Sequence, residues 1–324
     1  MGQHPARPPV VSIHELGTLG GAVSQAKSVN GLGHVVGTSR DAMGRTRAFL
    51  WQEQLGIVDL KPLTGVNTSA NDINEHGEIA GGGDTGFGDF HAYLLSGGTS
   101  FDLGTLGGNE SEALAVNRPG QVAGHSRVAG APAKRAFFIP EPGRMLDLGT
   151  LGGATSIAHD VNDRGEVVGF AETPAGEPHA FLWTRGQGMR DLGTSGAGAS
   201  MALAINNHTA IVGGGRHAFL CTEQLGIVDL GTLGGRTSCA NDINDVGCVV
   251  GASQTAATDA RGLPVTRAFL RTADGRMLDL GTLGGEHSAA AAVSEEVDGT
   301  LWIVGHSHDA AARVRAVLWA VRLG

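Results

Sequence analysis

One seven-residue motif recurs along the whole chain and constrains its fold more than any other feature. The clearest copy is Asp147-Leu148-Gly149-Thr150-Leu151-Gly152-Gly153. Close copies begin at Glu15, Asp102, Asp229 and Asp279, and degenerate copies begin at Asp59 and Asp191. Successive copies start 38 to 50 residues apart. A period in this range is typical of solenoids, propellers and other repeat architectures.

The residues between two copies of the motif indicate which of these architectures the chain forms. After Gly153 comes a stretch of small and β-branched residues ending at Asn162, then a turn containing Gly165, and then the apolar pair before Gly169. A variable loop leads to His179-Ala180-Phe181-Leu182-Trp183, and a short turn leads to the next motif. This pattern predicts four short strands joined by turns rich in Gly, Asn and Asp. The apolar spacing of helical repeats is absent, so the sequence predicts a β-propeller of four-stranded antiparallel blades.

The two ends of the sequence predict how the ring closes. Residues 10–16 resemble a fourth strand without the first three, and residues 315–319 resemble a third strand without the fourth. Pairing these segments completes a seventh blade and covers two strand edges. We therefore expect an all-β fold, a seven-bladed β-propeller, as a single domain over residues 10–324 with an N-terminal tail at residues 1–9.

The third strand of each unit carries the tripeptide that gives a known repeat family its name. His179-Ala180-Phe181 and His217-Ala218-Phe219 contain it, and Arg-Ala-Phe variants begin at Arg47, Arg135 and Arg267. In these motifs, over nearly its whole length, the chain resembles the HAF-repeat family. The resemblance implies an extracellular repeat protein and supplies no assigned activity or catalytic residue. The second and fifth units depart from the motif, at residues 61–64 and 195–197.

Charge and hydropathy indicate which binding partners and which cellular compartment the sequence favours. The net charge is −9, the pI is about 5.8, and Lys and Arg form no cluster, so we expect no nucleic-acid partner. No apolar run is long enough to span a membrane, and residues 1–9 lack the apolar centre of a secretory signal peptide. The printed chain therefore favours a cytoplasmic protein, whereas the family resemblance implies an extracellular one. We expect a monomer.

Binding is expected on one face of the ring. The loops from the fourth strand to the next first strand, and those from the second to the third strand, share the face that surrounds the channel mouth. The second-to-third loops vary most in length, which is typical of a diversified binding face. Residue types repeated in most units are instead expected to stabilise the blades through hydrogen bonds. These are the cation before Ala-Phe, the Asn that ends the first strand, and Asp72, Asp160 and Asp242.

The seventh unit holds a group of histidines on this face. Glu286 and His287 precede its first strand, and His306 and His308 lie two residues apart in the second strand, so their side chains point to the same side. Histidines with a carboxylate are typical ligands of divalent metals such as zinc. The sequence therefore predicts a candidate metal site at His287, His306 and His308. Exposed loop residues without a ligand are the alternative interpretation.

The third, fifth and sixth units supply the remaining candidates. Glu110 and His125 combine a carboxylate with an imidazole, as general acid–base catalysis requires. Arg216 and Arg236 could hold an anionic group between them. The catalytic candidates are Glu110, His125, Glu286 and His287, and the ligand-binding candidates are Asn109, Arg127, Arg216, Arg236 and His306.

Two functions from different classes follow. The first is a propeller that binds a small molecule, a sugar or a peptide on the loop face around the channel. The alternative is an enzyme for a small molecule, a lyase, cyclase or hydrolase, with its site at the channel mouth. A divalent metal is the one cofactor that the sequence suggests, and it would assist the enzyme.

Overall fold

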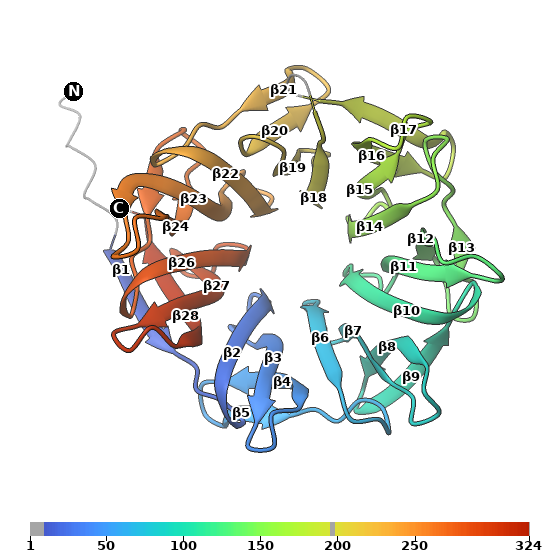
Figure 1. Cartoon of the computed structure of the whole chain (residues 1–324), viewed down its shortest axis with the longest axis horizontal. Coiled ribbons are helices and arrows are strands. Elements are labelled where there is room, and N and C mark those ends of the chain that lie inside the picture. The colour runs from blue at the N-terminus through green and yellow to red at the C-terminus, as the bar shows by residue number, and fades with distance from the viewer. Residues whose placement is uncertain (1–9, 195–197, 324) are drawn as a thin grey trace.

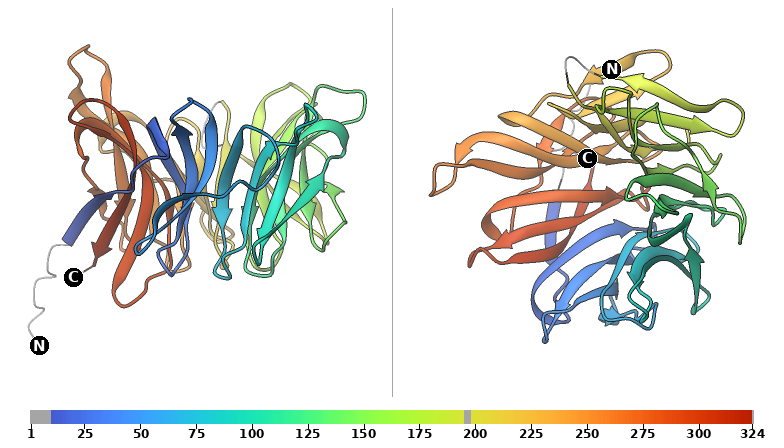
Figure 2. Two further views of the ribbon diagram at one scale, coloured as in Figure 1. Left: turned by 90° about the horizontal axis from the view of Figure 1, so that it is seen from below. Right: turned by 45° about the vertical axis from the view of Figure 1, so that its right-hand side comes forward.

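The chain folds into β-strands arranged around a central channel. The computed structural model describes residues 10–194 and 198–323, and this part of the chain contains strands β1 to β28 and no helix. The curled sheets surround the channel (Figure 1), and their strands run from one face of the ring to the other (Figure 2). The all-β prediction is therefore confirmed. The predicted tail at residues 1–9 and the degenerate motif at 195–197 lie outside the described residues.

The strands follow one another as antiparallel meanders that lead from the channel outward. The first comprises β2 (Gly20–Val29), β3 (Val35–Asp41), β4 (Thr46–Gln52) and β5 (Gly56–Asp59). Next come β6 (Thr68–Ile73), β7 (Ile79–Asp84), β8 (Phe90–Ser96) and β9 (Thr99–Gly104), and then β10 (Gly107–Val116), β11 (Val122–Val128), β12 (Lys134–Ile139) and β13 (Leu146–Asp147). They are followed by β14 (Ser156–Val161), β15 (Val167–Glu172), β16 (Pro178–Thr184) and β17 (Gly188–Gly193).

The second half of the chain continues in the same way. It comprises β18 (Met201–Ile205), β19 (Ile211–Gly214), β20 (Phe219–Thr222) and β21 (Gly226–Asp229), and then β22 (Gly234–Ile243), β23 (Val249–Thr258), β24 (Pro264–Arg271) and β25 (Met277–Asp279). The last group is β26 (Gly284–Val293), β27 (Thr300–Asp309) and β28 (Val314–Arg322), and β28 pairs antiparallel with β1 (Val10–Glu15) from the other end of the chain. The first strand of each meander lies beside the channel (Figure 1).

The turn between the first two strands of a meander is built by an asparagine and a glycine. In the turn after β14, Asn162 Oδ1 accepts the backbone N–H groups of Arg164 and Glu166, each at 3.1 Å. Gly165 has φ = 72°, in the left-handed region that favours glycine. The Asn-x-x-Gly pattern thus has a local cause: it supplies the hydrogen-bond acceptor and the backbone freedom that the turn needs.

Apolar layers between neighbouring sheets form the core. Phe181 of β16 is fully buried and packs with Ala136 and Phe138 of the preceding meander. An aromatic ring occupies the equivalent buried position at Phe49, Tyr93, Phe137, Phe219 and Phe269. Burying one such ring stabilises the fold by about 1.5–3 kcal/mol. Each layer therefore joins two meanders that are neighbours in the ring, and one layer joins the first meander to the last.

A buried hydroxyl at the start of each inner strand links neighbouring meanders. Ser156 accepts the N–H of Ala136 at 2.9 Å and donates to the carbonyl of Gly149 at 2.6 Å. The corresponding acceptors of the alanine N–H are Ser24, Thr68, Ser111, Ser200, Ser238 and Ser288. In the bond to Ser24 the donor is Ala316, so this link joins the two ends of the chain.

A ladder of asparagine side chains links the other ends of the inner strands. The Nδ2 group of Asn117 donates to the carbonyl of Asn162, and Asn162 donates to that of Asn206. The same bond starts from Asn30, Asn74, Asn206 and Asn244. Ser294 accepts the last of these bonds, because serine stands where the other meanders carry asparagine. The predicted blade-stabilising role of these asparagines is therefore supported by direct contacts.

Candidate functional site

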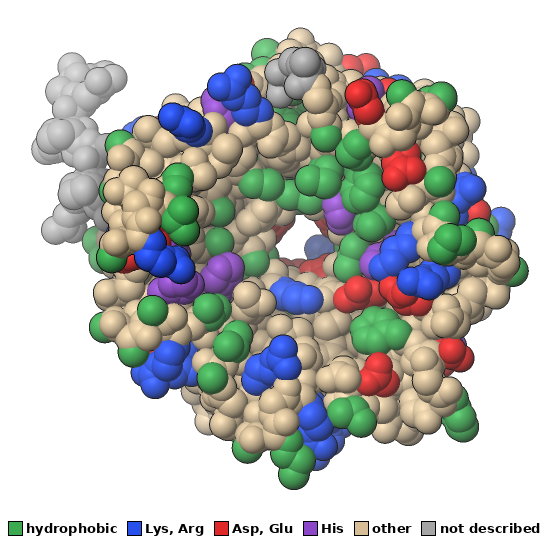
Figure 3. Space-filling model, in the orientation of Figure 1, with side chains coloured by type: hydrophobic (Ala, Val, Ile, Leu, Met, Phe, Trp, Pro, Cys, Tyr) green, Lys and Arg blue, Asp and Glu red, His purple; other side chains and the backbone are tan. Residues whose placement is uncertain are grey.

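One mouth of the channel lies on the face formed by the loops that join the second and third strands of each meander. This mouth is polar on one side and apolar on the other. Figure 3 shows acidic and basic side chains gathered along one edge of the opening and hydrophobic side chains along the opposite edge. Inner strands β14 and β18 carry Ile157 and Met201 at the register position that Glu112 holds in β10, and Leu203 follows two residues after Met201. These apolar side chains are half-buried or exposed. Phe170 of β15 is also half-buried, and its ring packs against His159 at a centroid distance of 5.7 Å.

Four side chains from three inner strands form the polar side, which we call the mouth network: Lys27, Ser69, Asn71 and Glu112. Lys27 Nζ donates to Asn71 Oδ1 at 2.5 Å, and Asn71 Nδ2 donates to Glu112 Oε1 at 2.9 Å. Ser69 donates to the same carboxylate oxygen at 3.1 Å. The two residues in each of these hydrogen bonds are 41 to 44 positions apart in the sequence. Only the geometry of the repeat therefore brings them together.

Each charge of the mouth network is satisfied only in part. Among the described residues, the ammonium of Lys27 has one hydrogen-bond partner and forms no ion pair, although an ammonium can donate three bonds. Oε2 of Glu112 likewise accepts no hydrogen bond from the described residues. Burial lowers the pKa of Lys27, and the carboxylate of Glu112 opposes that shift only in part. The network thus holds two opposite charges with unused hydrogen-bonding capacity.

The second polar group, the rim cluster, comprises Glu110, His125, Arg127 and Lys134. Glu110 forms ion pairs with Lys134 Nζ at 2.6 Å and with Arg127 Nε at 2.9 Å. Lys134 Nζ also lies 2.9 Å from Nε2 of His125. Three of the four residues predicted for this unit therefore lie together. The fourth, Asn109, lines a surface hollow with Arg127.

The protonation states in the rim cluster are set by its ion pairs and by burial. The hydrogen bond from Lys134 lowers the pKa of Glu110, so this carboxylate is ionised. Burial, reinforced by Lys134, lowers the pKa of His125 to about 4, so its imidazole is neutral. A lysine ammonium can only donate, so Nε2 of His125 accepts and Nδ1 carries the proton. Neither residue has a pKa near neutrality, which general acid–base catalysis favours.

The histidines predicted as metal ligands lie together in part. The rings of His287 and His308 pack edge to face at a centroid distance of 5.2 Å. Burial lowers the pKa of His306 and of His308, and the charge of a neighbouring histidine lowers each pKa further: His308 acts on His306, and His287 acts on His308. The compact ligand group among the described residues is a different one, however: single ligand atoms of Asp259, Glu286 and His287 lie within 4.8 Å of one another. Asp259 comes from the loop after β23, which the sequence analysis did not select.

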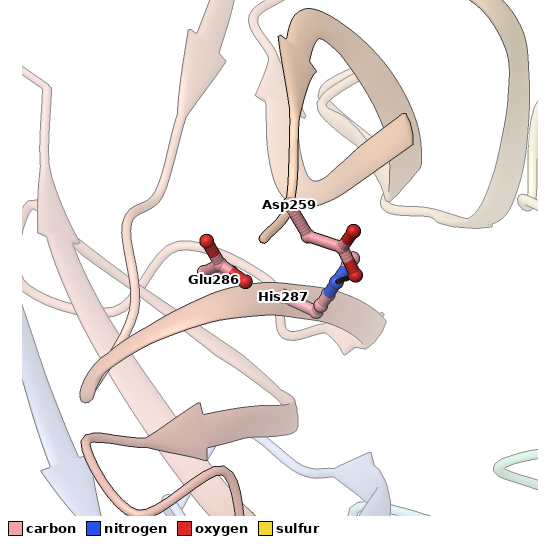
Figure 4. A group of neighbouring side chains, drawn as sticks. All are labelled: Asp259, Glu286 and His287. Atoms are coloured by element: carbon pink, nitrogen blue, oxygen red, sulfur yellow. Dashed lines mark ion pairs between the residues drawn. The ribbon is translucent and has the colours of Figure 1, made fainter. Parts of the chain in front are cut away.

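The contacts of this group fit a structural role better than metal binding. Figure 4 shows Asp259 and His287 turned toward each other, and Nε2 of His287 lies 3.8 Å from Asp259 Oδ2. Nδ1 of His287 accepts the N–H of Thr266 at 3.2 Å, so the proton of the neutral ring is on Nε2, which faces the carboxylate. An imidazole in this state offers no lone pair at Nε2. Glu286 alone has no hydrogen bond or ion pair among the described residues.

Asp259 has the same contacts as two other hairpin aspartates. Its Oδ1 accepts the N–H groups of Arg261 and Leu263, and its Oδ2 accepts from the Arg261 guanidinium. Asp41 and Asp309 bind the second and fourth residues after them in the same way, each with an arginine on the other oxygen. Asp259 is therefore a turn-forming residue of the fold.

The repeated cations before Ala-Phe pair with the aspartate of the motif. His91, His179 and His217 contact Asp102, Asp191 and Asp229 at 2.9, 2.9 and 2.7 Å, and Arg47 contacts Asp59 at 3.1 Å. These bonds join the third strand to the fourth, as the sequence analysis expected. Arg216 and Arg236 are exposed next to the His217–Asp229 pair: the charge of Arg216 acts on Asp229, and the carbonyl of Arg236 contacts His217. Their role as an anion clamp stays a prediction.

Three further carboxyl groups, of Asp72, Asp160 and Asp242, lie on inner strands β6, β14 and β22. Asp160 Oδ2 accepts the N–H of Ile205 in the next inner strand at 2.8 Å, and Asp72 and Asp242 bind Val116 and Val293 in the same way. Burial raises the pKa of all three, to about 7 for Asp160 and about 8 for Asp242. These bonds, together with the one from the Ser28 hydroxyl to Asp72 Oδ1, join neighbouring meanders, as expected for residues that stabilise the ring.

Comparison with solved structures shows the fold. TolB from Acinetobacter baumannii matches with a TM-score of 0.51 and 13% identity over 75% of this chain and 62% of that chain, so the chain spans less than two thirds of the TolB length. A gluconolactonase from Xanthomonas campestris matches with a TM-score of 0.44 and 12% identity over 100% of this chain and 99% of that chain. No family model and no curated protein matches the sequence. TolB is a β-propeller, so the predicted propeller fold is confirmed, whereas the HAF-repeat resemblance stays a prediction.

The structure also bears on membrane association. Among residues 10–194 and 198–323, no helix is long and apolar enough to cross a bilayer.

Proposed function

We propose that residues 10–324 form one domain, a seven-bladed HAF-repeat propeller closed by β1. The antiparallel pairing of β1 with β28 supports closure. The hydrogen bond from Ala316 to Ser24 supports it independently, because it repeats the serine link found between the other meanders. An extracellular location is part of the same proposal and rests on the family resemblance alone.

We infer that the protein binds a small polar ligand at the channel mouth, against the mouth network. The observation that carries this inference is the pair of half-buried charges of Lys27 and Glu112. The hydrogen-bond partners of both groups are the neutral side chains of Asn71 and Ser69. A half-buried charge without a counter-ion is costly unless something else solvates or neutralises it. Among residues 10–194 and 198–323, this arrangement occurs once, unlike the repeated ion pairs, as expected for a binding site.

Binding is a better proposal than catalysis at this mouth. Glu110 is held by two cations and Nε2 of His125 by Lys134, so neither group is free to transfer a proton to a ligand. The mouth network lacks a nucleophile with an adjacent base, since its one hydroxyl, Ser69, donates to Glu112.

A ligand screen tests the proposal. Thermal unfolding would be followed with a library of amino acids, sugars, short peptides and organic acids, using wild type, Glu112→Gln and the control Glu177→Gln. The control removes the same charge from the same face, at an exposed glutamate of the loop between β15 and β16. We expect at least one compound to stabilise wild type and Glu177→Gln but not Glu112→Gln. A library without such a compound would contradict the proposed function.

The second candidate is a metal-assisted enzyme, for which the grouping of Asp259, Glu286 and His287 is the favouring observation. Its test is elemental analysis of the purified protein and of a His287→Ala variant. The structural role of Asp259 predicts less than one tenth of an equivalent of divalent metal in both. Stoichiometric metal that the substitution removes would favour the enzyme.

A further inference from the structure

The mouth network offers both signs of charge to one ligand. Lys27 and Glu112 come from β2 and β10, and Asn71 of β6 stands between them and bonds to both. The spacer keeps the ammonium and the carboxylate apart: they form no ion pair within 4.0 Å, although Lys27 is close enough for Glu112 to influence its charge. An ammonium and a carboxylate held apart in this way can receive a carboxylate and an ammonium of a ligand.

The surroundings leave these two charges available. The neighbouring Glu110 is already paired with Arg127 and Lys134, so it does not compete for Lys27. Gly82 of β7 leaves room for Glu112: a Cβ at this position would lie 3.0 Å from Glu112 Cγ and 2.5 Å from the ring of Phe90. Oε2 of Glu112 accepts no hydrogen bond from the described residues.

The opposite edge of the mouth is apolar. Ile157 and Leu203 are half-buried and Met201 is 36% exposed, on β14 and β18, the inner strands that follow β10 around the ring. Leu114, also half-buried, lies on β10 two residues after Glu112. Contiguous apolar side chains beside a few convergent polar groups are typical of small-molecule sites. A ligand that spans the mouth therefore meets charge at one end and an apolar surface at the other.

From this juxtaposition we propose that the channel mouth binds a free α-amino acid with an apolar side chain. The ligand carboxylate pairs with Lys27, its ammonium pairs with Glu112, and its side chain contacts the apolar edge. This inference rests on the proposed function and names the ligand class of the same site. A sugar would leave both charges unneutralised, and an organic acid or an amine would neutralise only one.

Calorimetric titration with L-leucine tests the inference. Isocaproate lacks only the ammonium, isoamylamine lacks only the carboxylate, and glycine lacks the apolar side chain. Each charged contact contributes about tenfold or more in affinity, so we expect L-leucine to bind at least tenfold more tightly than either single-charge analogue and more tightly than glycine. Lys27→Met and Glu112→Gln should each weaken L-leucine binding at least tenfold, and the exposed-loop control Glu177→Gln should leave it unchanged.

Urea denaturation of each variant separates a loss of binding from a loss of folding. If one variant unfolds, the other still tests its own end of the ligand, and the analogues test both ends in wild type. Absence of L-leucine binding at millimolar concentration, or equal binding of isocaproate or isoamylamine, would overturn the inference. In that case, a different library compound that requires Glu112 would leave the proposed function standing, and a library without any such compound would remove both.

Discussion

The buried hydroxyl that links neighbouring meanders, a serine in every meander except at Thr68, gives the sharpest test of how the ring is held together. Ser156 is fully buried, accepts the N–H of the fully buried Ala136 and donates to Gly149. In Ser156→Ala, the Ala136 N–H keeps no partner at that site. A buried donor without a partner costs about 1–3 kcal/mol, and the lost bond to Gly149 adds about 1 kcal/mol. We therefore expect the free energy of unfolding to fall by about 2–4 kcal/mol.

Urea denaturation followed by tryptophan fluorescence would measure this change. Ser156→Thr is the matched control, because Thr68 occupies the equivalent position and accepts the N–H of Ala48 at 2.9 Å. Threonine should retain the link, with a loss below about 1.5 kcal/mol for the added methyl group. Equal stability of Ser156→Ala and wild type would refute the view that these hydroxyls join the meanders.

The remaining predictions concern pH and two single substitutions. The pKa of Asp242 in the folded state, about 8, lies above its ordinary value of 3.8, so between these pH values the folded state binds a proton that the unfolded chain has released. The free energy of unfolding should therefore fall as pH rises from about 4 to about 8, and Asp242→Asn should flatten this slope in urea titrations. An unchanged slope in the variant would show that other groups cause it. Gly152→Val should lower the melting temperature, because Gly152 has φ = 107° and a Cβ would lie 2.9 Å from Pro174 Cγ; an unchanged melting temperature would contradict our account of the repeated motif. His287→Ala should lower the free energy of unfolding by less than about 1.5 kcal/mol, since its ring makes one backbone hydrogen bond; global unfolding in circular dichroism would show that the ring supports more than its loop.

The sequence predicted some site residues better than others, for a physical reason. Glu110, His125 and Arg127 lie close together in one unit, on strands that form a hairpin, so their proximity followed from the strand pattern. Lys27 and Asn71 were missed because each looks like an isolated polar residue in a strand of small residues. Comparing the same strand position across units would have singled out Lys27, because no other unit has a cation of the Lys or Arg type there: the other residues are Asn71, Leu114, His159, Leu203, Asn241 and Ala291.

The metal candidate shows the opposite case. The sequence placed His287, His306 and His308 near one another, and two of these rings do pack together. The structure adds Asp259 from a loop 28 residues away from His287 and shows its carboxylate occupied by Arg261 and two backbone N–H groups. Residue types and spacing do not reveal such hydrogen bonds, because they depend on the path of a variable loop.

The sequence by itself determined the strands, the turns and the repeat. Those features depend on neighbouring residues: Gly165 permits the left-handed turn, Asn162 caps it, and a buried aromatic recurs once per unit. Only the tertiary structure decided which side chains of different units meet. More than forty residues separate Lys27 from Asn71, and again Asn71 from Glu112. The packing of each sheet on the next sets the curvature of the ring, and this curvature brings the three side chains together on one side of the channel mouth.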